Sequence, residues 1–168
     1  MEGAIVNKVA ESALITINLE DYLPKEAVRV FDLKDYLFQG LILKEKDFRQ
    51  ALHETDWSSY QNQTVLITCS ADAIIPMWAH MLVASHLQPQ AAAVFFGTQE
   101  AFTNAQLLKN IAAIEPAAFQ DKRIVIKGCG SQPIPEAAYV TITTKLLPVA
   151  KSIMYGEPCS TVPIFKKK

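Results

Sequence analysis

Short apolar runs alternate with longer segments of helical period in the second half of the chain. The apolar runs are rich in branched and aromatic residues, which is typical of buried strands: residues 65–68, 92–96 and 124–127. The segments after them place apolar residues three or four positions apart and predict helices: about 75–87, 99–114 and 135–154. Strands joined by helices run parallel, so this half predicts a mainly parallel sheet with right-handed crossovers.

Capping and breaking residues set the expected ends of these helices. Thr98 is placed to cap the helix over 99–114. Pro148 should kink the last helix or break it in two, and Gly156 is a candidate for its end. In the common strand order, the strand over 65–68 would lie between the other two.

The first 60 residues have a less regular pattern. Residues 13–19 and 28–33 favour short strands, Gly40 marks a turn, and 41–43 is a candidate third strand. From about residue 44 to 54 the period becomes helical, with charges on the opposite face. The sequence therefore predicts a single α/β domain of three layers: a βαβαβα core over 61–168 and an N-terminal α+β extension over 1–60.

Composition excludes several classes of protein. The 168 residues are 50% hydrophobic and 20% charged, as in ordinary soluble domains. A formal net charge of −1 gives no basic surface for nucleic acid. No apolar stretch approaches the roughly 20 residues of a membrane span, and no signal peptide is visible. We therefore expect a cytoplasmic protein, in which the three cysteines stay reduced and form no disulfide framework.

Two cysteines occur where a strand gives way to a loop ahead of a helix. Cys69 follows the strand over 65–68, and Cys129 follows the strand over 124–127 between Gly128 and Gly130. In open parallel sheets the carboxyl ends of the strands form the edge where ligands bind. If the two strands are neighbours, both thiols lie in the same crevice.

A metal centre is one interpretation of the cysteines. Cys159 lies after the last predicted helix, and the chain there has enough length to return towards the other two. Three converging thiolates suit zinc or the iron of an iron–sulfur cluster, with Asp72, His80 or a partner's group as the fourth ligand. The alternative is that all three are small buried side chains, as free cysteines often are.

A nucleophilic cysteine is the second interpretation. A Cys129 thiolate between two glycines, near a helix N-terminus and the backbone amides around Gly128, Gly130 and Ser131, would have a depressed pKa. His80 or His53 would be its base. The segment has neither the later glycine of a dinucleotide fingerprint nor the Gly-Lys of a phosphate-binding loop, which excludes both nucleotide-binding motifs.

Three segments of the second half carry a resemblance to a known family. Its motif residues in this chain are Cys69, Asp72, Pro76, Trp78, Gly128, Cys129, Gly130, Pro135, Gly156, Glu157, Pro158, Cys159 and Pro163. With these residues the chain resembles a bacterial family known only as a domain of unknown function. The resemblance implies genes that neighbour those of iron–sulfur assembly, and hence iron–sulfur assembly proteins as partners.

Three functions therefore stand as hypotheses. The first is an accessory protein of iron–sulfur assembly that binds iron, a cluster or zinc through Cys69, Cys129 and Cys159. The second is a sulfur or acyl transferase with Cys129 as its nucleophile. The third is an interaction module that docks a partner or a second copy of the chain.

Overall fold

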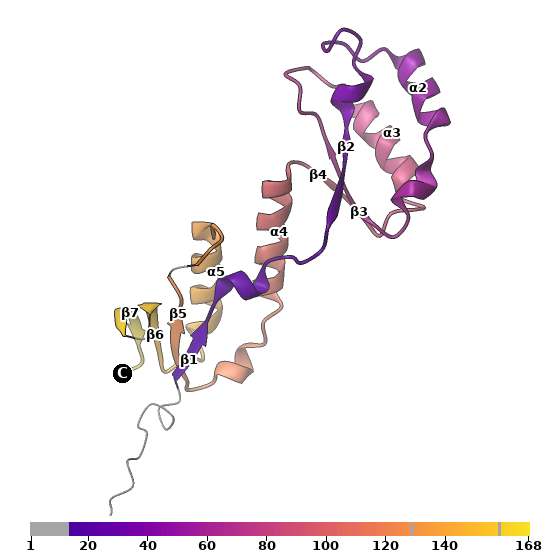
Figure 1. Cartoon of the computed structure of the whole chain (residues 1–168). Coiled ribbons are helices and arrows are strands. Elements are labelled where there is room, and N and C mark those ends of the chain that lie inside the picture. Colours follow the sequence, from indigo (N-terminus) through magenta and orange to yellow (C-terminus); the bar gives the residue numbers. More distant parts are fainter. Residues whose placement is uncertain (1–13, 129, 158) are drawn as a thin grey trace, which may run out of the picture. The chain divides into compact units, whose positions relative to one another are not determined.

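The protein has a mixed α/β fold in a computed structural model that describes residues 14–128, 130–157 and 159–168 (Figure 1). The strands of this part of the chain are β1 (Leu14–Ile17), β2 (Val28–Asp32), β3 (Thr64–Thr68), β4 (Ala93–Phe96), β5 (Arg123–Ile126), β6 (Ser152–Glu157) and β7 (Ser160–Lys166). The α-helices are α2 (Glu45–Glu54), α3 (Met77–Leu87), α4 (Gln99–Ala112) and α5 (Glu136–Leu146). Short 3-10 helices are η1 (Leu19–Tyr22), η2 (Leu33–Tyr36), η3 (Trp57–Tyr60) and η4 (Pro116–Phe119). Among the described residues, no helix combines the length and the apolar character that a bilayer crossing requires.

The chain divides into two compact units, each with its own sheet. Unit 1 comprises the residues up to Pro24 together with Asn104–Lys168, and unit 2 comprises Lys25–Thr103. In unit 1 the strand order is β1-β5-β6-β7, parallel except for the antiparallel pair β6–β7. In unit 2 the order is β2-β3-β4, and both pairs are parallel. That the whole chain forms a single domain stays a prediction.

Each unit also has its own hydrophobic core. In unit 1 the central strand β5 packs against the apolar stripe of α5, where Ala138, Ile142 and Leu146 repeat at four-residue spacing and are fully buried. In unit 2 the stripe of α3 that packs under the central strand β3 is Ala79, Val83 and Leu87. Burial of a leucine or isoleucine contributes about 1.5–3 kcal/mol, so these stripes fix each helix on its sheet.

The two units are copies of one structural pattern. The elements η3, β3, α3 and β4 of unit 2 recur as η4, β5, α5 and β6 of unit 1, and their first residues are 59 positions apart in every case (57 to 116, 64 to 123, 77 to 136, 93 to 152). The offset also relates buried Phe48 and Leu52 of α2 to buried Leu107 and Ile111 of α4. We call residues 45–97 and 104–156 the two repeats.

The two repeats also share details of backbone conformation, which a chance likeness would not reproduce. Asn62 and Asp121 both have a positive φ, of 59° and 54°, and both donate their backbone N–H to a carbonyl near the end of the next helix at 3.0 and 2.9 Å. Gly97 and Gly156 have φ of 137° and 121°. Directly after the first strand of each unit's sheet, β1 or β2, the segments NLEDYL (18–23) and DLKDYL (32–37) form the same capped 3-10 turn.

Several predictions from the sequence are wrong. The strands β3 and β5 belong to different sheets and are not neighbours. The last helix ends at Leu146 ahead of Pro148, and Gly156 lies in strand β6 and does not end a helix. Residues 41–43 form no strand beyond one isolated bridge, between Phe38 and Ile42.

The first and last strands of the described chain differ in how well the sequence predicted them. The predicted strand over 13–19 is confirmed as Leu14–Ile17, with position 13 outside the described residues. Strand β7 was not predicted, because Pro163 and the terminal lysines are typical of a tail. Proline is tolerated at a sheet edge, and β7 is an edge strand.

Candidate functional site

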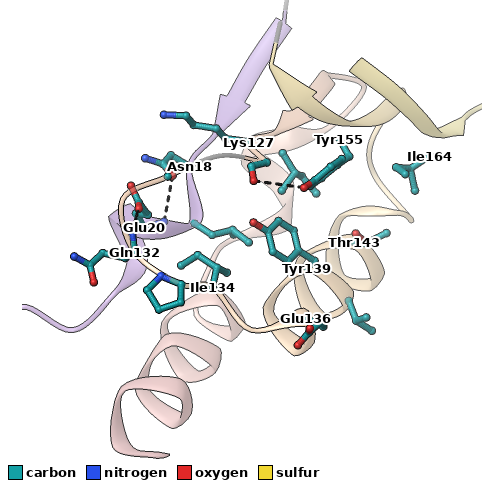
Figure 2. Close-up of a pocket in the computed structure, with 16 residues that line it drawn as sticks. Asn18, Glu20, Lys127, Gln132, Ile134, Glu136, Tyr139, Thr143, Tyr155 and Ile164 are labelled. Carbon is teal, nitrogen blue, oxygen red and sulfur yellow. Dashed lines mark hydrogen bonds between the residues drawn. The ribbon is translucent and has the colours of Figure 1, made fainter. Parts of the chain in front are cut away.

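Unit 1 contains a cavity of about 750 Å³ at the carboxyl ends of its parallel strands β1 and β5 (Figure 2). The loop after β1, the loop after β5 and the first turns of α5 surround it. Its walls are Asn18, Leu19, Glu20, Ile126, Lys127, Gly128, Gly130, Gln132, Pro133, Ile134, Glu136, Tyr139, Val140, Thr143, Tyr155 and Ile164. This is the sheet edge at which the sequence predicts a ligand site.

Glu20 organises the polar end of the cavity. Its carboxylate accepts a 2.5 Å hydrogen bond from the backbone N–H of Gln132 and a 3.3 Å bond from the Ser131 hydroxyl. Asn18 accepts from the backbone N–H of Glu20 at 3.3 Å and so fixes the turn that carries the carboxylate. These contacts attach the loop after β5 to the turn after β1, and Figure 2 shows Asn18, Glu20 and Gln132 together at this end.

The same hydrogen bonds change the acidity of Glu20. The bond from the Gln132 amide, supported by Ser131 and Asn18, lowers the pKa of Glu20 below its ordinary value of 4.5. A lowered pKa in the folded state means that the ionised form holds the loop. The contribution to stability is therefore complete above pH 4.5 and is lost as the pH falls through the folded-state pKa.

We expect the Gln132 amide proton to report this titration. Its chemical shift should move with a midpoint below pH 4.5, because the shift follows the charge of Glu20. In Glu20→Gln the shift should be flat over the same range, since the amide side chain does not ionise. A midpoint at or above 4.5 in the wild-type protein would show that the hydrogen bond is absent in solution.

Two tyrosines form the opposite wall. The rings of Tyr139 on α5 and Tyr155 on β6 meet edge to face, with centroids 5.8 Å apart and an interplanar angle of 75°. The Tyr155 hydroxyl donates a 3.4 Å hydrogen bond to the Gly128 carbonyl (Figure 2). Around them, Ile134, Val140 and Ile164 make the wall apolar.

The two glycines of the loop after β5 allow these close approaches. A Cβ on Gly128 would lie 2.7 Å from the Tyr155 ring, which is closer than carbon atoms can pack. A Cβ on Gly130 would overlap the Glu20 carboxylate. A side chain at either position would therefore displace a wall of the cavity, the Tyr155 ring in one case and the Glu20 carboxylate in the other.

The structure brings together only part of the predicted site. Gly128 and Gly130 line the cavity, and Ser131 bonds to Glu20, so this part of the loop does contribute to a site. Cys129 lies outside the described residues. Glu20 and Tyr155 are site residues that the sequence pattern did not predict. The repeated NLEDYL and DLKDYL turns are the sequence signal that marks Glu20.

The other predicted thiols occupy different surroundings. Cys69 follows β3 in unit 2, is partly buried, and donates its S–H to the Ala71 carbonyl at 3.6 Å. Cys159 is exposed between β6 and β7 of unit 1. Asp72 is exposed and does not cap α3, whose N-cap is Pro76. Within the described part of the chain, no three histidine, cysteine or carboxylate side chains are grouped as metal ligands.

His80, the predicted base or ligand, belongs to unit 2. Its ring meets Phe96 edge to face at 5.0 Å, and its buried Nδ1 has no hydrogen-bond partner. Burial lowers the pKa of His80, which keeps the imidazole neutral. In the repeat, His80 and Phe96 correspond to Tyr139 and Tyr155.

Fold and cavity together define the protein as a duplicated α/β protein with a ligand-sized cavity at a parallel sheet edge. The chain belongs to the family described as "Protein of unknown function (DUF2480)", whose model matches residues 3–167. Among curated proteins no match was found. Solved structures gave no match either.

Proposed function

We propose that the protein binds a small organic molecule in the cavity of unit 1. The observation that carries the proposal is a cavity of about 750 Å³ at the carboxyl edge of parallel strands, within the 300–1,000 Å³ typical of ligand pockets. Its walls combine a broad apolar surface with a few polar groups, which is the composition of small-molecule sites.

The charges of the lining restrict the chemistry of the ligand. Glu20 and Glu136 supply two carboxylates, against one ammonium group from Lys127. A carboxylate accepts hydrogen bonds and donates none, so the polar end suits a ligand with N–H or O–H donors. The aromatic wall of Tyr139 and Tyr155 suits a flat apolar body. The ligand class is therefore a neutral or cationic molecule with an apolar body and a donor group.

A fluorescent probe of this class tests the proposal. N-phenyl-1-naphthylamine is neutral and apolar, has flat aromatic rings, and donates one hydrogen bond from its amine. Its fluorescence should rise on titration with the protein and saturate at one site per chain. Absence of a saturable site would contradict the proposal.

A second function, nucleophilic chemistry at Cys129, is favoured by one observation: both of its neighbours, Gly128 and Gly130, line the cavity. In an acyl transfer the Cys129 thiolate would attack the carbonyl carbon of an acyl thioester. The C–S bond of the donor would break as the new thioester bond to Cys129 forms, and the leaving thiolate would take up a proton equivalent to the one that Cys129 lost on ionising. The apolar walls of the cavity suit an acyl group.

Cysteine variants separate this role from the predicted metal centre of an iron–sulfur assembly protein. An acyl thioester should add one acyl group to the wild-type protein and to Cys159→Ser, and none to Cys129→Ser, as intact mass shows. Binding of iron, sulfide or zinc by the protein isolated without oxygen, lost in the triple Cys→Ser variant, would instead support the metal centre. If neither result is obtained, both cysteine roles are wrong and the binding function is unaffected.

A further inference from the structure

The face of unit 2 that corresponds to the cavity walls leaves large apolar side chains in solvent. Four of these side chains are Ile74 (94% exposed), Met77 (74%), Met81 (71%) and Phe96 (65%). At the offset of 59 they correspond to four cavity-lining residues of unit 1, namely Pro133, Glu136, Val140 and Tyr155. We call the four residues of unit 2 the unit 2 patch.

The patch joins the start of α3 to the end of β4. Met77 and Met81 are one helical turn apart on α3, and the edge-to-face contact between His80 and Phe96 ties this end of the helix to the last residue of β4. Large apolar side chains that are exposed together on neighbouring elements mark an interaction site.

Unit 1 shows what covers the equivalent strand. There β7 pairs antiparallel with β6, and Ile164 of β7 contributes to the cavity wall. Unit 2 has no such strand in the described part of the chain, where its sheet ends at β4. The edge of β4 and the unit 2 patch therefore lack the antiparallel strand that the other copy of the repeat has.

We infer that a second copy of this chain supplies that strand, through antiparallel pairing of β4 with β4 of its partner about a twofold axis. A strand that pairs with its own copy in this way is antiparallel by symmetry, as β7 is to β6. The result is a continuous sheet with three strands from each copy.

The composition of β4 fits this partner. Its sequence is AVFF. Charged residues and prolines protect exposed sheet edges from pairing, and β4 contains neither. The opposite edge strand of the same sheet, β2, carries Arg29 and Asp32. The four residues of the unit 2 patch are also uncharged, so two copies meet there without like-charge repulsion.

Light scattering during size-exclusion chromatography of the full chain tests the inference. The wild-type protein should have twice the chain mass of 18.6 kDa. The Met81→Lys/Phe96→Lys variant should have the mass of one chain, because each interface would bury four ammonium groups. Val140→Lys places a lysine at the position of unit 1 that corresponds to Met81, where Val140 is 62% exposed, and this variant should remain a dimer.

Further measurements separate loss of the dimer interface from misfolding of the variant. Circular dichroism of the Met81→Lys/Phe96→Lys variant should match the wild type, since both side chains are mostly in solvent. Hydrogen exchange at the amides of Ala93–Phe96 whose N–H groups point away from β3 should slow as wild-type concentration rises, and should not depend on concentration in the variant. A wild-type protein with the mass of one chain, or a variant that stays dimeric, would overturn the inference.

Discussion

Ile134→Trp should weaken binding of N-phenyl-1-naphthylamine by at least about tenfold, which is about 1.4 kcal/mol. Ile134 is part of the apolar wall of the unit 1 cavity, and an indole ring at this position fills space that the probe needs. Fluorescence titration measures the effect. Ile134 is partly buried against the core of unit 1, so chemical denaturation of the variant should accompany the titration and show a folded protein.

Val162→Trp is the matched control for this prediction. Val162 also belongs to unit 1, is 57% exposed on β7, and does not line the cavity. Its substitution adds a ring of the same size to the same unit, so probe affinity should stay within about twofold of the wild type. Equal affinity in all three proteins would place the probe outside the cavity.

Gly128→Ala should lower the free energy of unfolding by about 1–2 kcal/mol, the combined contribution of the Tyr139–Tyr155 ring pair and the Tyr155 hydrogen bond that the new methyl group displaces. The new Cβ would lie 2.7 Å from the Tyr155 ring and must displace it. Displacement breaks the contact with Tyr139 and the hydrogen bond to the Gly128 carbonyl, so the aromatic wall opens. Chemical denaturation gives the stability, and the probe titration should show weaker binding in parallel.

A double-mutant cycle isolates the steric cause. In a Tyr155→Ala background the same Gly128→Ala change should cost much less, with a coupling of about 1 kcal/mol or more. Cys69 stands at the equivalent position of unit 2, so the repeat itself accepts a side chain there. Equal costs in both backgrounds would mean that the glycine is required by its backbone conformation and not by Tyr155.

Local sequence patterns predicted the elements well and their partners poorly. The apolar runs of β3, β4 and β5 and the helical period of α2, α3 and α4 appear in the structure within a few residues of the expected ends. Strand pairing is a long-range choice that apolar runs do not encode, and for this reason β3 and β5 were expected in one sheet.

The cavity shows the same limit. The loop around Gly128 and Gly130 was predicted as a site because glycines at a strand end are a local signal. Its main partner, Glu20, is 112 positions from Gln132 in the chain, and no local pattern connects the two. The repeat does connect them, because the same turn and loop recur in unit 2, after β2 and after β3. There Asp32 accepts two hydrogen bonds from Ser70, one from its hydroxyl at 2.5 Å and one from its backbone N–H at 3.0 Å.

Site-resolved NMR of the wild-type protein during titration with N-phenyl-1-naphthylamine tests the central claim most directly. Signals of Ile134, Tyr139 and Tyr155 should shift together and saturate at one probe per chain, because all three line the cavity of unit 1. Shifts confined to Met77, Met81 and Phe96 of the unit 2 patch, with the cavity signals unchanged, would contradict it.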